Sequence, residues 1–409
     1  MVRLKLRRRS PPSPSDAGRP VGATAYRQVN VAVAIAGFTS FALLHGAQPI
    51  LPQLAHEFRV SPGVSSLVVA AGTAAMAMLL IPLSMLSDRY GRRPLMRAGL
   101  VGASVLALAS SLAPDFWSLV ICRACLGVCI AGVPAAAMAY LGEEVAVESQ
   151  GRAMGIYIGA TALGGMSGRL LSALVTGWAN WRFGLAVLGL LGALATFAFW
   201  CLLPPGSHFQ PRSLQPRALL CDLRQIYTDA ELPWLFAVAF LIMGAFVGFY
   251  NYLGFRLSLP PYGFGAAAVG AIFMFYAIGS FSAAWAVSAA PRHGEVRFLL
   301  WMSGLMIVGA QISLAKALPL VIAGLALFTF GYFALHAVAS SWVGRRGGGR
   351  RGLVSALYLS SYYLGGSVIG SATGWSWQHG GWPDVVMALS ACSLCSMGIL
   401  LHLRGLAGP

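Results

Sequence analysis

The sequence predicts an all-α polytopic membrane protein, with twelve transmembrane helices in two six-helix bundles related by a parallel repeat. Three observations support this prediction. The 409 residues are 57% hydrophobic and only 10% charged, whereas a soluble domain carries about 25% charged residues. Apolar runs of about 20 residues, the length of a helix that spans a bilayer, recur along the chain. Basic residues also gather in every second loop, that is, in the loops on one side of the membrane.

Twelve apolar runs are expected to cross the membrane as helices, because a helix satisfies its own backbone groups in hydrocarbon. The first six cover roughly residues 29–52, 63–86, 95–113, 116–140, 153–175 and 182–203. The second six cover roughly residues 233–254, 265–289, 298–315, 318–341, 353–375 and 384–403.

These runs divide the chain into four units. Residues 1–27 are rich in Pro, Ser and Arg and are expected to form a disordered basic tail. Residues 28–204 form the N-terminal bundle, residues 205–232 a polar linker, and residues 233–404 the C-terminal bundle.

The basic residues predict the orientation of the chain. With the N-terminus inside, 22 Lys and Arg residues fall on the inner side and four on the outer side. Basic loops are retained in the cytoplasm during insertion. We therefore expect both termini and the linker to be cytoplasmic. The net charge of +16 is explained by topology, and no nucleic-acid partner is expected.

The two halves carry matching residues at an offset of 201 positions. Tyr157, Gly164-Gly165 and Trp181 correspond to Tyr358, Gly365-Gly366 and Trp382. Six crossings are an even number, so both halves enter the bilayer with the same orientation. A parallel repeat of this kind places a substrate path between the halves.

Residues 83–96 read LSMLSDRYGRRPLM and lie between two apolar runs. The segment resembles the loop between the second and third helices of major facilitator transporters, Gly-x-Leu-Ala-Asp-Arg-x-Gly-Arg-Lys. Ser84 and Ser87 depart from this pattern, and Arg93 replaces its Lys. The positions that match the pattern, with Arg93 counted as a basic residue in the place of Lys, are Leu86, Asp88, Arg89, Gly91, Arg92 and Arg93.

The resemblance covers about residues 28–404 and is greatest to the twelve-helix drug:proton antiporter type of the bacterial inner membrane. It implies alternating access, with proton-coupled efflux of a small organic molecule such as a drug-like compound, a sugar or a siderophore. Drug resistance and siderophore export are thus among the expected roles. A nutrient or metabolite importer on the same fold is the first alternative. A polytopic membrane enzyme or a receptor is the second.

The same resemblance implies a gate on the cytoplasmic side. Asp88, Arg89, Gly91, Arg92 and Arg93 would form the motif loop of this gate. The acids that end the fourth span, Glu143 and Glu144, resemble the family's acid that pairs with the motif arginine. The alternative is that the basic cluster only sets the topology.

Four ionisable side chains lie deep within the predicted spans, and none of them is Asp or Glu: His45, Arg123, Arg169 and His336. Such groups are costly in hydrocarbon and usually functional. Arg123 and Gly127 resemble the family's fourth-helix motif, whose Arg is linked to proton transfer in related exporters. An arginine that extends toward the outer surface is the alternative for Arg123 and for Arg169. Pairing with Asp115 is a further alternative for Arg123.

The two histidines have different expected roles. His45, with Gln48 in the outer half of the first span, could carry the coupled proton or could be a structural, hydrogen-bonded histidine. His336 is expected to lie at the membrane interface.

The fifth span carries closely spaced glycines. Gly164 and Gly168 match the antiporter signature Gly-x-x-x-Gly-Pro-x-x-Gly-Gly, whereas Ala160, Gly165 and Arg169 depart from it. Small residues allow close helix packing. Gly164, Gly165 and Gly168 therefore predict either a hinge or a static helix contact.

Aromatic residues of the second half are expected to line the cavity: Tyr250, Phe273, Tyr276, Tyr358 and Tyr362. Their rings suit planar or cationic ligands, although any one of them could instead face lipid.

The sequence has no P-loop, His-Glu-x-x-His or Gly-x-Ser-x-Gly motif. Accordingly, no enzymatic activity, ATP, cofactor or metal is expected. The expected partners are a small-molecule substrate, protons and the lipid bilayer, and the chain is expected to act as a monomer.

Overall fold

The computed structural model describes residues 23–204, 206, 209, 211 and 216–406, and the described residues contain helices and no strand. The predicted tail therefore lies outside the described residues except for residues 23–27. The first half contains α1 (Ala23–His45), η2 (Gln48–Ile50), α2 (Leu51–Phe58), α3 (Pro62–Ser65), α4 (Leu67–Tyr90), α5 (Arg92–Ser111), α6 (Phe116–Ala131), α7 (Val133–Glu144), α8 (Val147–Trp178) and α9 (Trp181–Leu202).

The second half follows a short helix, α10 (Pro216–Tyr227), which the sequence analysis did not predict in the polar linker. This half contains α11 (Leu232–Ser258), α12 (Ala266–Ala271), η3 (Ile272–Phe275), α13 (Tyr276–His293), α14 (Glu295–Ile312), α15 (Leu318–Arg346), η4 (Gly348–Arg350) and α16 (Arg351–Leu406).

The described residues contain eleven long apolar helical stretches. One of these stretches contains two crossings, so the number of crossings is twelve. The last stretch, α16, has 56 residues and is interrupted at Gly381, whose φ of 64° and ψ of −145° are not helical. At 1.5 Å per residue the stretch is more than twice the thickness of a hydrocarbon core of about 30 Å. It therefore contains two crossings that meet at Gly381, and the prediction of twelve transmembrane helices is confirmed.

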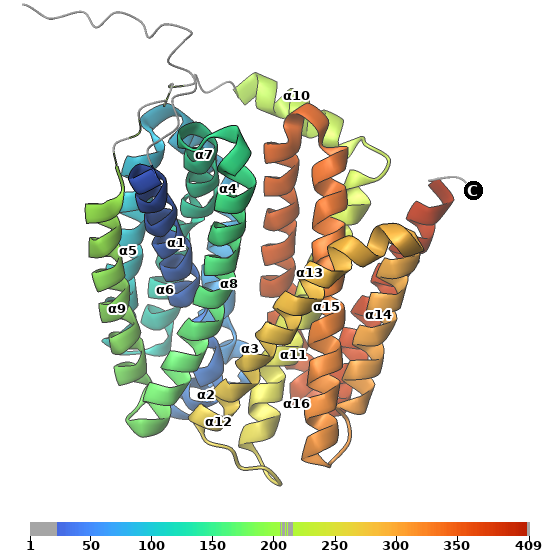
Figure 1. The fold of residues 1–409 in the computed structure, drawn as a ribbon. Coiled ribbons are helices and arrows are strands. Elements are labelled where there is room, and N and C mark those ends of the chain that lie inside the picture. The colour runs from blue at the N-terminus through green and yellow to red at the C-terminus, as the bar shows by residue number, and fades with distance from the viewer. Residues whose placement is uncertain (1–22, 205, 207–208, 210, 212–215, 407–409) are drawn as a thin grey trace, which may run out of the picture.

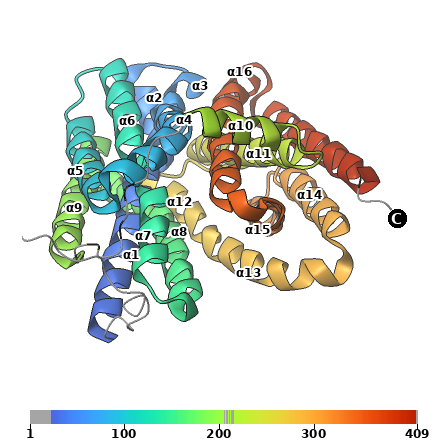
Figure 2. The same cartoon turned by 90° about the horizontal axis from the view of Figure 1, so that it is seen from above.

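The helices gather into two groups that lie side by side (Figure 1). The first group comprises α1 to α9 and the second comprises α11 and α13 to α16, whereas the short α12 packs against α8 of the first group (Figure 2). The start of α1, the linker helix α10 and the end of α16 lie at one end of the molecule, called here the terminal face. The opposite end, which carries α2, α3 and α12, is called the loop face.

The linker helix is attached to the second half by ion pairs at the terminal face. Asp222 of α10 pairs with Arg350 at 2.7 Å. Asp229, just after α10, pairs with Arg346 at 3.2 Å. The Asp229 carboxylate also accepts hydrogen bonds from the backbone N–H groups of Glu231, just before α11, and of Leu232, its first residue, which have no partner within the helix.

The repeat predicted from the sequence is visible in the packing of each half. A Cβ atom on Gly164 of α8 would lie 2.1 Å from the Phe38 carbonyl oxygen of α1. A Cβ atom on Gly365 of α16 would lie 1.9 Å from the Phe240 carbonyl oxygen of α11. Each half thus presses the backbone of its fifth crossing against its first, which requires glycine at the point of contact.

Substitution of Gly164 tests this contact. We expect Gly164→Ala to destabilise the protein by about 1–3 kcal/mol, because the added methyl group overpacks a backbone contact. Gly159→Ala on the same helix is the matched control, since a Cβ atom there would meet no atom within 4 Å. Thermal unfolding in detergent measures both variants, and equal melting temperatures for the two would contradict the close packing.

Candidate functional site

The two halves touch near the loop face through small polar side chains. The Ser66 hydroxyl donates to Ser371 Oγ at 3.0 Å. Deeper in the molecule, about two turns along α4 and one turn along α16, the hydroxyl oxygens of Thr73 and Ser367 lie 2.7 Å apart. These bonds join α4 to α16 and close the loop face over the space between the bundles.

A polar bridge also crosses between the halves. Arg169 Nε on α8 donates to Gln48 Oε1 at 2.6 Å, and Gln48 Nε2 donates to Asn251 Oδ1 on α11 at 2.8 Å. Arg169, Gln48 and Asn251 are 5%, 4% and 3% exposed. Because buried polar groups need partners, this series of hydrogen bonds fixes both halves to the η2 segment.

The Arg169 guanidinium also faces aromatic rings of the second half. Its central carbon lies 5.2 Å from the Phe273 ring centre and 5.0 Å from that of Tyr276. Tyr250 stacks on Phe273 with ring centres 5.2 Å apart. A cation over ring faces at this distance is attracted to their negative faces. The structure thus brings Arg169 of the first half together with three of the predicted aromatic residues.

The aromatic cluster continues toward the terminal face. Tyr332 stacks on Phe246 with ring centres 3.7 Å apart, and its hydroxyl is hydrogen-bonded to that of Tyr362. His336 Nδ1 lies 3.1 Å from the Tyr358 hydroxyl, and the His336 ring centre lies 4.5 Å from that of Tyr362. All five predicted cavity aromatics therefore belong to one connected cluster.

The expectation that His336 lies at the membrane interface is wrong. Its ring contacts Tyr332, Tyr358 and Tyr362 inside the second half. The residue is ten positions before the end of α15, or about 15 Å from the terminal face. Hydropathy placed it by distance from the span end, whereas the tyrosines that surround it come from sequence positions that only the fold brings together.

Arg123 caps the end of the first helix. Its guanidinium donates to the carbonyl oxygens of Leu43, at 2.9 Å, and of Leu44. These are among the last carbonyls of α1, which have no partner within the helix and carry the negative end of its dipole. Arg123 is only 1% exposed. The structure therefore places it deep inside the first half and not extended to the surface.

His45 lies between the two buried arginines without a hydrogen bond to either. Its Nδ1 lies 3.2 Å from the Phe41 carbonyl oxygen, and its ring stacks on that of Phe41. Among the described residues no carboxylate pairs with Arg123 or Arg169. The interior near the bundle contact is consequently electropositive.

At the terminal face, the motif loop forms a charged cluster within the first half. Arg92 pairs with Asp88 and, at 2.9 Å, with Glu143 of α7. It also donates to the Ser87 hydroxyl at 3.2 Å. Arg92 is 7% exposed, so both carboxylates hold one largely buried guanidinium. The structure brings these three predicted gate residues together.

The remaining predicted gate residues have separate roles. Gly91 has a φ of 107° between α4 and α5, a conformation that favours glycine. Arg89 is exposed and lies over the Tyr90 ring. Arg93 lines a surface groove with Trp200. Glu144 is 8% exposed at the end of α7.

Among the described residues, the terminal face shows no closure between the bundles comparable to that of the loop face. The bundles diverge toward this face (Figure 1). A Cβ atom on Gly151, Gly155 or Gly352 would meet no atom within 4 Å. In the described part of the chain, the Asp88 and Glu143 ion pairs stay within the first half. The two bundles are thus in contact at the loop face and apart at the terminal face.

The predicted hinge glycines divide into two kinds. Gly164 and Gly168 press directly on the backbone of α1. Gly165 instead faces the Arg169 side chain, and its carbonyl oxygen accepts a hydrogen bond from Arg169 at 2.7 Å. The hinge role of all three stays a prediction.

Sequence reasoning missed Asn251, Ser66, Ser371, Thr73 and Ser367. Asn251 carried a usable signal, because it is an amide within a long apolar run. The hydroxyl residues carried none, since Ser and Thr are common in membrane helices and bond to their own backbone.

Comparisons with known proteins place this geometry in context. A family model described as Major Facilitator Superfamily matches residues 33–371. The inner membrane transport protein YnfM of Escherichia coli K12 is 40% identical over 385 residues, which are 94% of this chain and 92% of that protein. The uncharacterised MFS-type transporter YybF of Bacillus subtilis 168 is 38% identical over 365 residues, 89% of this chain and 90% of that one.

A solved structure shares the fold. It is a bacterial homologue of the human lysosomal transporter Spinster, in an inward-facing and unoccupied conformation. The likeness has a TM-score of 0.73 at 15% identity and covers 94% of this chain and 95% of that one.

Closure of the loop face can be tested with a cysteine pair. In a background without the seven native cysteines, Ser66→Cys with Ser371→Cys is expected to form a disulfide, because the two hydroxyl oxygens are 3.0 Å apart. A protease site inserted into the linker near residues 212–215 allows the halves to separate after cleavage. On a non-reducing gel the double variant should stay joined. The two single-cysteine variants are the controls, and separation of the double variant would refute the contact.

Proposed function

Because the chain belongs to the Major Facilitator Superfamily, a family of membrane transporters, we propose that it exports a small organic molecule across the bacterial inner membrane in exchange for protons. In this proposal both termini are cytoplasmic, since the basic residues gather on that side. Passage occurs by alternating access, in which the two bundles rock about a central site.

One observation carries the proposal of alternating access: the bundles are joined at the loop face and separated at the terminal face. The side-chain hydrogen bonds that join the described parts of the two bundles are few. They come from Ser66, Thr73 and the Arg169–Gln48–Asn251 bridge. Contacts of this kind can be exchanged for others without unfolding either bundle. With cytoplasmic termini, the described state is the one that is open inward.

The chemistry of the central site supports a planar substrate that carries an acidic or electron-rich group. Aromatic faces from Tyr250, Phe273 and Tyr276 offer stacking surfaces. Arg169 adds a fixed positive charge with no carboxylate partner among the described residues. An anionic group on the substrate would offset the cost of that buried charge. Of the drug-like, sugar and siderophore classes, this favours aromatic compounds over simple sugars.

The sequence motifs support the proposed direction and coupling ion. Gly164 and Gly168 match the antiporter signature in part, which favours export. Proton coupling needs a side chain that can gain and lose a proton, and the His45 imidazole is the candidate that the sequence analysis offers. Arg123, which the fourth-helix resemblance suggests for coupling, would act through its hold on the end of α1. Import of a nutrient or metabolite on the same fold is the second candidate.

Vesicle transport tests the proposal. Inside-out vesicles with an acidic interior should accumulate labelled aromatic acids, and an uncoupler should abolish the uptake. Arg169→Gln should reduce uptake strongly because the anion-binding charge is lost. Arg297→Gln is the control, since Arg297 is an exposed arginine on the terminal face. Energised accumulation only in right-side-out vesicles would establish import, and binding without flux would indicate a receptor.

The gate is tested by removal of one charge. We expect Asp88→Asn to lower transport several-fold, because Arg92 loses one of its two carboxylate partners and the terminal face can no longer form its closed arrangement. Glu295→Gln is the matched control, as it breaks an exposed ion pair with Arg345 at the same face of the second half. Expression and melting temperature should stay unchanged in both. Normal flux in Asp88→Asn would assign the motif loop to topology alone.

A further inference from the structure

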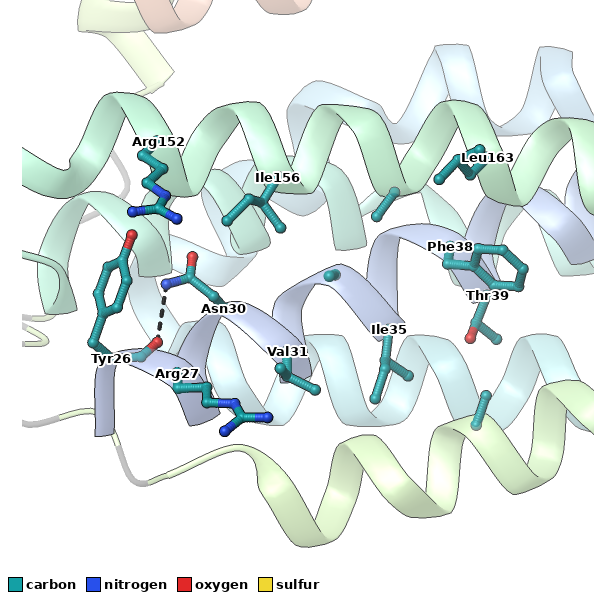
Figure 3. A pocket seen from close by; sticks show the side chains of 13 residues that line it. Tyr26, Arg27, Asn30, Val31, Ile35, Phe38, Thr39, Arg152, Ile156 and Leu163 are labelled. Carbon is teal, nitrogen blue, oxygen red and sulfur yellow. Dashed lines mark hydrogen bonds between the residues drawn. The ribbon is translucent and has the colours of Figure 1, made fainter. Parts of the chain in front are cut away.

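A groove of about 550 Å³ lies on the flank of the first half, away from the central site. It is lined by α1, α8 and one residue of α9, and by no residue of the second half. Figure 3 shows α1 along the floor of the groove, with Arg152, Ile156 and Leu163 of α8 along one side. The groove therefore opens sideways, where the bilayer surrounds a membrane-spanning bundle.

The end of the groove nearest the terminal face is basic and polar. Arg27 and Arg152 flank it, and the Arg152 guanidinium points toward the Tyr26 hydroxyl (Figure 3). Both arginines are exposed, and neither forms an ion pair with a described residue. Two free guanidinium groups at one end of a membrane-facing groove form a site for a phosphate group.

Polar atoms inside the groove also lack partners among the described residues. Asn30 is 7% exposed and Thr39 is 2% exposed. The Asn30 side-chain nitrogen donates to the Tyr26 carbonyl oxygen at 2.9 Å. Its side-chain oxygen, the Thr39 hydroxyl and the Tyr26 hydroxyl have no hydrogen-bond partner. Such groups are costly to leave unpaired away from water. The protein covers these atoms, so a ligand with polar atoms would pair with them after a turn of the Tyr26 or Asn30 side chain.

Beyond Asn30 the groove is apolar along its length. Val31, Ile35 and Phe38 line it from α1, and Ile156 and Leu163 line it from α8. The fourteen residues from Tyr26 to Thr39 span about 20 Å of helix, which exceeds half of a hydrocarbon core of about 30 Å. An acyl chain that begins at the membrane surface fits this length.

We propose that the groove binds one anionic glycerophospholipid of the leaflet at the terminal face. Its phosphate lies between Arg27 and Arg152, its glycerol and ester groups pair with Tyr26 and Asn30, and one acyl chain follows α1 toward Thr39. The bound lipid would brace α1 against α8, the helix that carries Arg169. This proposal does not depend on the direction of transport or on the substrate.

The test uses the full chain in phosphatidylcholine nanodiscs with a fraction of phosphatidylglycerol, followed by native mass spectrometry of the released protein. The wild type should retain one phosphatidylglycerol with about thirtyfold preference over phosphatidylcholine, as expected for two arginines near the surface. Arg27→Gln with Arg152→Gln should lose the preference. Arg297→Gln with Arg404→Gln removes the same charge from the same face and should keep it.

Two further arms separate the possible occupants. Ala160→Phe fills the groove but leaves both arginines, and it should also lose the lipid if the acyl chain occupies the groove. Inorganic phosphate should not displace the lipid. Melting temperatures in pure phosphatidylcholine check that the variants are folded. Equal lipid retention in the wild type and the Arg27/Arg152 double variant would overturn the proposal. Displacement of the lipid by a transported substrate would instead assign the groove to substrate entry.

Discussion

The interruption of the first transmembrane helix determines how the rest of the central site is built. α1 ends at His45, inside the bundle, and its last carbonyls would be unpaired in a medium without water. Arg123 covers two of them. The break then lets the η2 segment turn Gln48 toward Arg169 and Asn251, so that one amide connects both halves. Without the cap from Arg123 the break would be costly, and without the break Gln48 could not bridge the bundles.

The two ends of the molecule use different physical means of contact. Near the loop face, glycine and hydroxyl residues let the bundles approach closely; a Cβ atom on Gly374 would lie 2.2 Å from Gly63 Cα. At the terminal face, charged groups pair within their own half or with the linker helix. Charged side chains are long and can exchange partners in water, whereas backbone contacts are either made or broken. A molecule with both kinds of contact is suited to two discrete arrangements of its bundles, as transport by this family requires.

Much of the fold was predictable because the bilayer restricts the options. Apolar length predicted twelve crossings, including the two that meet at Gly381, and the Gly164 and Gly365 echo predicted equivalent packing in the two halves. α10 was missed because its amphipathic sequence lies within a polar linker, where no apolar run marks it. The aromatic cluster was identified by residue type, but the position of His336 within it was wrong, since distance from a span end does not show which neighbouring helices surround a side chain.

The sequence by itself determined that this protein is a bundle of membrane helices in two similar halves, with two arginines and no acid deep in the spans. It did so because hydrophobic length and residue charge are local properties. Only the tertiary structure decided the partners of those arginines: Arg123 caps carbonyls, and Arg169 joins Gln48 and faces aromatic rings. These partners are separated by 79 to 121 positions in the chain, and contacts over such separations depend on how helices pack, which no local pattern encodes.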